Sequence, residues 1–214
     1  MGRKSMALVQ PAHTGCGAQS ILKNEGDMMM KTLIINGSPR KNGNTATLLN
    51  ELKKHLNGEV NQIDTYYAKS LPCYDCRYCW TNAGCVIEDE MQDVYKMMEE
   101  ADNVVIASPV YFGNLTGSLL NWASRLQYFW VSRYIRKIEP LSAKCRKGAV
   151  ILIVNHGKDN IEPAIFAGKD LLKKARAECC EILQWSDADG ANQLPPAYLN
   201  VDKIVKLADA LNTR

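Results

Sequence analysis

Short apolar runs alternate with longer stretches of helical periodicity from Lys31 to the C-terminal end of the chain. Runs such as Leu33-Ile34-Ile35 are typical of strands that are buried on both faces. The longer stretches repeat apolar residues three and four positions apart, as amphipathic helices do. We expect strands at residues 32–35, 60–67, 103–108, 149–154 and 179–185. We expect helices at residues 45–56, 89–100, from 115 past 125, 163–177 and 198–211.

Strands that alternate with helices form βαβ units, which build a parallel sheet with helices on both faces. We therefore predict an α/β fold, a three-layer sandwich around a five-stranded parallel sheet in the order 2-1-3-4-5. In sheets of this order, ligands bind at the carboxyl ends of strands one and three, where the order reverses. This rule selects two loops, residues 37–45 and 108–114.

The chain has 214 residues and a net charge of +3, which suit one soluble domain and give no reason to invoke nucleic acid. No apolar stretch has the length of a membrane span, and we expect no secretory signal before the first strand. Residues 1–27 lack periodicity, and we expect an extension outside the fold, with disorder left open. Residues 28–214 form the single domain. We expect a cytoplasmic protein whose eight cysteines lie in a reducing compartment, where clustered cysteines bind metals or act in catalysis more often than they form disulfides.

The first selected loop, residues 37–45, joins a buried strand to a helix N-terminus, whose amides and dipole attract an anion. Ser38, Asn44 and Thr45 add hydroxyl and amide donors, and Arg40 adds a charged fork. The loop matches neither a Walker A sequence nor the dinucleotide fingerprint. Its composition predicts a terminal-phosphate site, and an ordinary βα turn is the alternative.

The second loop, residues 108–114, places Tyr111 and Phe112 between Pro109 and Gly113. These residues are suited to wall a flat ring, although packed side chains at a strand end would look the same. A ligand with a phosphate at one loop and a planar ring at the next loop matches FMN. A third loop, residues 155–160, follows the fourth strand and closes over the ring, unless His156 is merely a solvated loop histidine.

Four cysteines follow the second strand at the spacing C-x2-C-x2-C-x5-C: Cys73, Cys76, Cys79 and Cys85. Three cysteines two residues apart wrap one cluster, and a nearby fourth completes a thiolate shell for [4Fe-4S]. We treat residues 72–88 as a cysteine-rich insert in the domain. Zinc binding and free, redox or structural thiols remain alternatives.

These three motifs together resemble the NADPH-dependent FMN reductase family, and more narrowly its iron–sulfur flavoprotein branch. The resemblance implies a flavodoxin-like fold, non-covalent FMN, and a homodimer or homotetramer in which a neighbouring subunit helps to enclose the flavin. By motif match, the cluster ligands are the four cysteines named above. The phosphate ligands are Ser38, Arg40, Asn44 and Thr45, with Ala46 beside them. The ring-lining residues are Pro109, Val110, Tyr111, Phe112, Gly113 and Asn114, followed by His156 and Gly157.

We expect an electron-transfer oxidoreductase that takes electrons from NAD(P)H or a ferredoxin through FMN and the cluster to an acceptor. Flavin carries the chemistry, so no dedicated acid–base residue is expected. A cluster-free NAD(P)H-dependent FMN or quinone reductase, and a flavodoxin-like electron carrier, are the alternatives. The run Tyr128-Phe129-Trp130 cannot face one way on a helix, and we expect part of it to meet another subunit.

Overall fold

The computed structural model describes residues 29–154, 160–186 and 200–213, so the predicted extension at 1–27 lies outside the described residues. Its sheet is parallel throughout and runs β2-β1-β3-β4-β5, which confirms the predicted order and the flavodoxin-like arrangement. The strands are β1 (Lys31–Asn36), β2 (Glu59–Asp64), β3 (Asn103–Pro109), β4 (Arg146–Val154) and β5 (Ala177–Ser186).

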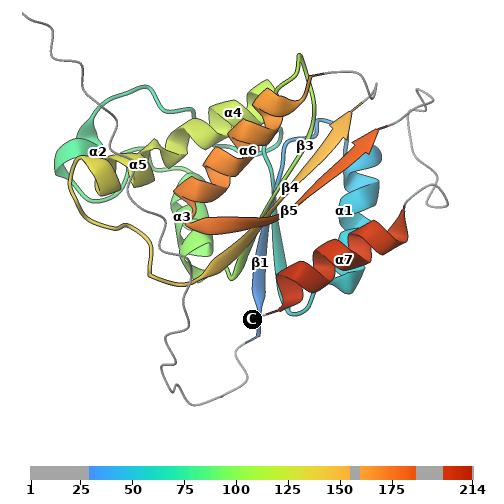
Figure 1. Ribbon diagram of the computed structural model, residues 1–214. Helices are drawn as coiled ribbons and strands as arrows, with labels where there is room; N and C mark the ends of the chain where they lie inside the picture. Colours follow the sequence, from blue (N-terminus) through green and yellow to red (C-terminus); the bar gives the residue numbers. More distant parts are fainter. Residues whose placement is uncertain (1–28, 155–159, 187–199, 214) are drawn as a thin grey trace, which may run out of the picture.

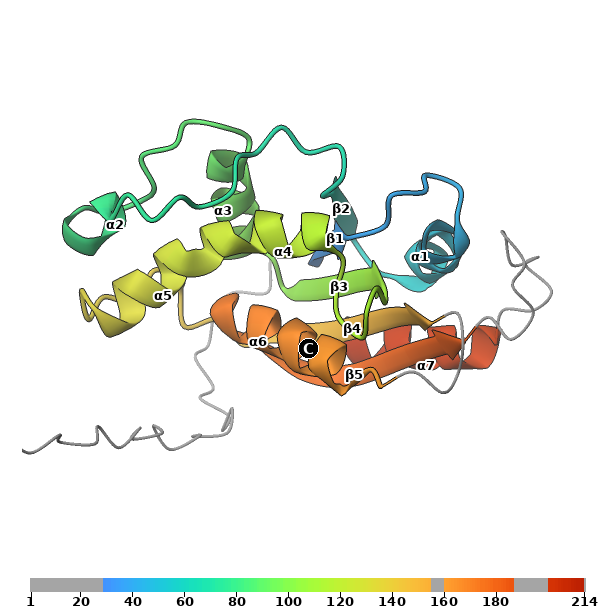
Figure 2. The ribbon, with the colours of Figure 1, turned by 90° about the horizontal axis from the view of Figure 1, so that it is seen from above.

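Helices cover both faces of the sheet, as Figures 1 and 2 show. One face carries α1 (Asn44–His55) and α7 (Val201–Asn212). The other carries α3 (Met91–Glu100), α4 (Gly117–Ala123) and α6 (Glu162–Lys174). A 3-10 turn, η1 (Ser124–Leu126), continues α4 into α5 (Gln127–Tyr134), and a short α2 (Tyr78–Thr81) lies in the cysteine-rich insert. The three-layer sandwich is therefore present as predicted.

The central strands are continuous apolar runs in the sequence because they are buried. In β3, residues Asn103 to Ser108 are all buried, and β4 is buried along nearly its whole length. Strand β2 lies at the edge and is only half-buried, so its sequence alternates loosely. Two apolar clusters, one under each helical layer, hold the sandwich together.

Several predicted elements differ in extent from the observed ones. The helix predicted at 163–177 ends at Lys174, and Ala177 already begins β5. The second strand ends at Asp64 rather than at residue 67, because the amides of Tyr67 and Ala68 turn back to the Asp64 carbonyl oxygen. The long helix predicted after residue 115 is interrupted by the 3-10 turn η1. Across the described ranges, no helix is long and apolar enough to span a bilayer.

Candidate functional site

The loop after β1 lies against the loop after β3, at the place where the strand order reverses. The Gly37 amide donates to the Ala107 carbonyl oxygen at 2.7 Å, and the Thr116 hydroxyl donates to the Gly37 carbonyl oxygen at 2.8 Å. A Cβ on Gly37 would lie 2.9 Å from Leu119 Cδ2 and 3.0 Å from Thr116 Oγ1. The close approach of the first loop to Thr116 and α4 therefore favours glycine at this position.

Buried hydrogen bonds shape the first loop. The Ser38 amide donates to Asn36 Oδ1 at 3.0 Å, and Asn36 Nδ2 donates to Asp64 at the end of β2 at 2.8 Å. The Arg40 amide donates to Ser38 Oγ at 3.3 Å. Asn36 was not among the predicted site residues. Its signal in the sequence is a polar residue at the end of an apolar strand, directly before the loop glycine.

The start of α1 is suited to an anion. Among the described residues, no side chain caps this helix, and its first turn carries no acidic residue. Thr45 is buried in that turn, and Arg40 and Lys41 are exposed beside it. The Lys41 ammonium lies 4.5 Å from the centre of the Tyr67 ring, so the cation is held close to the loop. Positive charge and helix amides thus converge here.

The second loop is a tight turn that presents aromatic rings to solvent. The Tyr111 and Asn114 amides donate to each other's carbonyl oxygens at 2.9 and 3.0 Å. The two central residues, Phe112 and Gly113, have φ of 53° and 74°, the combination of a type I′ turn. Phe112 is fully exposed and Tyr111 is 41% exposed. Neither ring is buried in the core, so the alternative of packed strand-end side chains is wrong.

The third loop is tied to the second where it enters α6. The Ala164 amide donates to the Gly113 carbonyl oxygen at 3.2 Å, and a Cβ on Gly113 would lie 2.8 Å from the Asn160 carbonyl oxygen. Ser108 is buried, and its hydroxyl accepts from the Thr116 amide at 3.2 Å. The predicted ligands His156 and Gly157 lie outside the described residues.

The four cysteines of the insert line one small pocket, together with Arg125, Tyr128 and Val131 from the α4–α5 stretch. All four carry free thiols. Burial raises the pKa of the Cys79 thiol, and the neighbouring Cys85, Cys73 and Cys76 raise it further. In the part of the chain that the structure describes, no three histidine, cysteine or acidic side chains form a group able to hold a metal ion. The four cysteines thus line one pocket but, in this structure, do not lie close enough together to form a metal-binding group.

A buried arginine connects the two ends of this insert. Arg125 Nη1 donates to the Leu71 carbonyl oxygen at 3.0 Å and to Asp89 Oδ2 at 2.6 Å. Its Nη2 donates to the Ile87 carbonyl oxygen at 3.3 Å. The neighbouring Ser124 hydroxyl accepts from the Cys73 amide at 2.9 Å. Arg125 was not among the predicted site residues, because its partners are distant in sequence.

Asp89 and Gln92 have the sequence spacing of a helix capping box, but they do not form one. Asp89 does accept from the Met91 amide at 3.0 Å, but its other oxygen is held by Arg125. The Gln92 side chain donates to the carbonyl oxygens of Cys85 at 3.0 Å and Ile87 at 2.7 Å. Both side chains therefore fix the end of the cysteine-rich insert rather than close a local cap.

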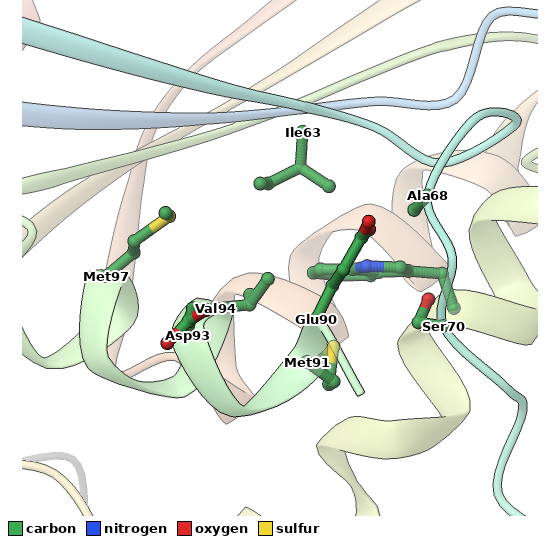
Figure 3. A pocket seen from close by; sticks show the side chains of 9 residues that line it. Ile63, Ala68, Ser70, Glu90, Met91, Asp93, Val94 and Met97 are labelled. Carbon is green, nitrogen blue, oxygen red and sulfur yellow. The ribbon is translucent and has the colours of Figure 1, made fainter. Parts of the chain in front are cut away.

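A second pocket, of about 210 Å³, lies beneath the chain segment that leads from β2 to the cysteines. Figure 3 shows Ile63 of β2 across from Val94 of α3, with Ala68 and Ser70 along one edge. Hydrogen bonds hold this segment over the pocket: the Lys69 amide donates to Glu90 at 2.8 Å and the Leu71 amide to Asp89 at 3.0 Å. Two carboxylates that directly precede α3 thus fix the segment.

The cysteine pocket lies at one end of the α4–α5 stretch, and the two candidate cofactor loops, residues 37–45 and 108–114, lie at the other end. Figures 1 and 2 both place α2 beside α5, away from α1. The distance from Gly117 to Tyr128 is on the order of 17 Å, at about 1.5 Å of helical rise per residue. One chain therefore presents two separate candidate sites.

The sequence model of the NADPH-dependent FMN reductase family matches residues 30–166 of this chain. An iron–sulfur flavoprotein of Archaeoglobus fulgidus is 35% identical over 100 residues, which are 45% of this chain and 46% of that protein. An iron–sulfur flavoprotein of Methanocaldococcus jannaschii is 37% identical over 93 residues, 42% of this chain and 48% of that protein. The chain thus matches about half the length of these curated relatives.

Solved structures support the fold. An NAD(P)H:quinone oxidoreductase from Methanothermobacter marburgensis superimposes with a TM-score of 0.64 over 87% of this chain and 99% of its own. The two sequences are 13% identical, so this likeness concerns the architecture alone.

Proposed function

The chain belongs to the NADPH-dependent FMN reductase family, and we propose that it is an FMN-dependent oxidoreductase of the iron–sulfur flavoprotein type. The observation that carries the proposal is the pair of loops held together at Gly37. One loop is an anion-binding helix start, and the other presents exposed aromatic rings. This pairing has the shape and chemistry that a flavin phosphate and a flat ring require.

The residues present fit FMN. We assign the phosphate to Ser38, Arg40, Asn44, Thr45 and Ala46, around the start of α1. We assign the isoalloxazine ring to the turn that runs from Pro109 to Asn114, with His156 and Gly157 as further candidates. Bound FMN supplies hydride and single-electron chemistry, which the chain itself lacks. The protein would contribute the binding and the orientation of the flavin.

We also propose that Cys73, Cys76, Cys79 and Cys85 hold a [4Fe-4S] cluster. Four thiols around one pocket match the ligand set of such a cluster, and the relatives described above carry iron–sulfur names. Free clustered thiols also suit a reducing, cytoplasmic location. Because the thiols do not form a ready metal group in the described residues, a cluster-free NAD(P)H-dependent FMN or quinone reductase is the second candidate.

We propose NAD(P)H or a ferredoxin as the electron donor, a small molecule as the acceptor, and a homodimer or homotetramer as the assembly. Hydride transfer to a flavin depends on contact geometry, which the open aromatic turn permits. A pure electron carrier, the remaining alternative, would not oxidise NADPH in the presence of a quinone.

Titration with FMN and with riboflavin tests the flavin site, since riboflavin lacks only the phosphate. We expect FMN to bind at least about a hundredfold more tightly, because charged hydrogen bonds add about 1.5–3 kcal/mol each. Thr45→Ala should weaken the binding of FMN about tenfold or more and leave the binding of riboflavin unchanged. Thr47→Ala is the matched control, because its hydroxyl donates to the Gly43 carbonyl oxygen within the same turn. Equal affinities for both flavins would contradict the phosphate assignment.

Anaerobic purification with iron and sulfide counts tests the cluster. About four irons per chain, together with flavin absorption bands, would support the iron–sulfur flavoprotein. Flavin without iron would favour the cluster-free reductase. A chain that neither carries nor takes up FMN would refute the proposed function as a whole.

A further inference from the structure

One buried guanidinium holds both ends of the cysteine-rich insert. The side chain of Arg125 is fully shielded from solvent. Its partners Leu71 and Ile87 lie on either side of the four cysteines, and Asp89 follows directly. An arginine presents five donors in a rigid fork, so the three acceptors fix the guanidinium and are fixed by it.

One nitrogen of the same guanidinium has no hydrogen-bond partner within the described part of the chain. Arg125 Nε is buried and, among the described residues, has no hydrogen-bond partner. Buried donors without partners are rare and costly in folded proteins. Arg125 also lines the pocket with all four cysteines. The unpartnered Nε thus belongs to a side chain that lines the thiol pocket.

We propose that Arg125 is a positioning residue for the cysteine site: it clamps residues 71–89 and keeps its Nε–H for a sulfur of the group that the cysteines hold. This inference rests on the proposed cluster. Hydrogen bonds to cluster sulfurs stabilise the more negative, reduced form and so raise the reduction potential. Arg125 would therefore set both the shape of the pocket and the potential of its contents.

Arg146 offers a matched control. It is equally buried and also bonds backbone carbonyl oxygens, those of Met98 at 3.0 Å, Glu99 at 2.8 Å and Ser142 at 3.2 Å. These partners join α3 to the start of β4, outside the cysteine-rich insert. If the loss of any buried arginine network were enough, Arg125→Lys and Arg146→Lys would change the cluster and its thiols alike. The proposed role predicts these changes for Arg125→Lys alone.

The experiment compares Arg125→Lys, Asp89→Asn and Arg146→Lys with the parent protein, each purified anaerobically with its flavin. Lysine retains a positive charge but lacks Nε–H and the fork. We measure iron and sulfide per chain, the midpoint potential of the cluster, and the alkylation rate of each thiol after the metal is removed. Cys179 in β5 is the internal reference thiol.

We expect Arg125→Lys to lower the cluster potential and to speed alkylation of the four insert thiols about tenfold. Asp89→Asn should raise the potential, because it removes a negative charge and leaves the guanidinium in place. Arg146→Lys should change neither. If the two substitutions merely loosened the insert, Arg125→Lys and Asp89→Asn would shift the cluster potential in the same direction. That result would overturn the proposal.

The outcomes separate this inference from the proposed cluster. If the parent protein holds flavin but no iron, the cluster proposal fails, and alkylation alone decides the inference. Faster alkylation in Arg125→Lys than in Arg146→Lys would then still support the clamp. Equal alkylation in the two variants would refute it. If Arg125→Lys does not fold, the sign of the Asp89→Asn potential shift decides.

Discussion

At the scale of single residues, Gly37 decides whether the two cofactor loops can meet. A methyl group at this position would press against Leu119 and the Thr116 hydroxyl, both within 3.0 Å. Gly37→Ala should therefore lower the free energy of unfolding by about 1–3 kcal/mol, as overpacking does elsewhere. It should also weaken FMN, because Thr116 would lose its bond to the Gly37 carbonyl oxygen.

Urea unfolding and flavin titration measure the two effects. Gly117→Ala is the control, since a Cβ there meets nothing within 4 Å. Its effect on stability should stay within about 0.5 kcal/mol. If the two alanine variants were equally stable, the close contact at Gly37 would have no energetic weight.

Asp89 gives the molecule a pH dependence that can be assigned to one carboxylate. Burial acts to raise its pKa, but the hydrogen bonds from Arg125, Leu71 and Met91 outweigh it, so the pKa lies below the ordinary value. The ionised form thus stabilises the folded state above the ordinary carboxyl pKa of about 3.9, and that stability is lost as pH falls through the lowered pKa.

Asp89→Asn should cost on the order of 3 kcal/mol at pH 7, because it leaves a buried arginine without its counter-charge. The difference in unfolding free energy between the two proteins should shrink as pH falls from about 5 to 2. Urea titrations at several pH values measure it. A difference that stayed constant over this range would show that the carboxylate charge does not stabilise the fold.

At the scale of elements, the turn after β3 combines strain with exposure. Phe112 has φ of 53°, a region that bulky residues rarely occupy, and its ring is fully exposed. Such outliers concentrate at functional positions. Phe112→Asn creates an Asn-Gly pair, which type I′ turns prefer. We expect this variant to gain about 0.5–1 kcal/mol in stability and to bind FMN about tenfold more weakly.

Thermal unfolding of the flavin-free protein measures the change in stability, and titration with FMN measures the change in affinity. Leu120→Asn serves as the comparison, since it also removes an exposed apolar side chain but lies on α4. A Phe112 variant with unchanged FMN affinity would remove this ring from the proposed flavin site.

The sequence predicted the elements that depend on local pattern. Apolar runs identify β1, β3 and β4 because these strands are buried on both faces, and the strand order follows from the βαβ alternation. The switch-point rule then selects the two loops to which we assign FMN. Roles that depend on distant contacts escaped this reasoning. Asp89 and Gln92 look like a local cap in sequence, yet their side chains serve the cysteine-rich insert.

Arg125 illustrates the same limit. In sequence it is one basic residue on a predicted amphipathic helix, where a solvated position is the ordinary expectation. Its burial follows from acceptors that lie 36 to 54 positions earlier in the chain. The cysteine spacing reveals the insert, but only the tertiary structure reveals what holds the insert in place.

At the scale of the whole molecule, the surface at the end of α5 suits an interface between copies of the chain. Within the run Tyr128-Phe129-Trp130, Phe129 is buried in the core, whereas Trp130 turns away and contacts Tyr134 with ring centres 5.4 Å apart. Tyr134, Ile135 and Ile138 follow and are 42%, 40% and 52% exposed. Exposed apolar side chains that cluster in this way mark association sites more often than scattered ones do.

We therefore expect the protein to be a homodimer or homotetramer in solution, with this surface in the contact. The double substitution Ile135→Asp and Ile138→Asp should reduce the assembly, because each buried carboxylate would lack a partner. Sedimentation velocity at micromolar concentration measures the change.

Phe166→Asp, at a 75% exposed position on α6, is the control and should leave the assembly intact. Dissociation by Phe166→Asp alone would move the interface to α6, and a monomeric parent protein with FMN bound would contradict the proposed oligomer. Since the cysteine pocket lies beside α5 and away from the cofactor loops, the oligomeric state also determines whether a neighbouring copy brings the two sites closer together.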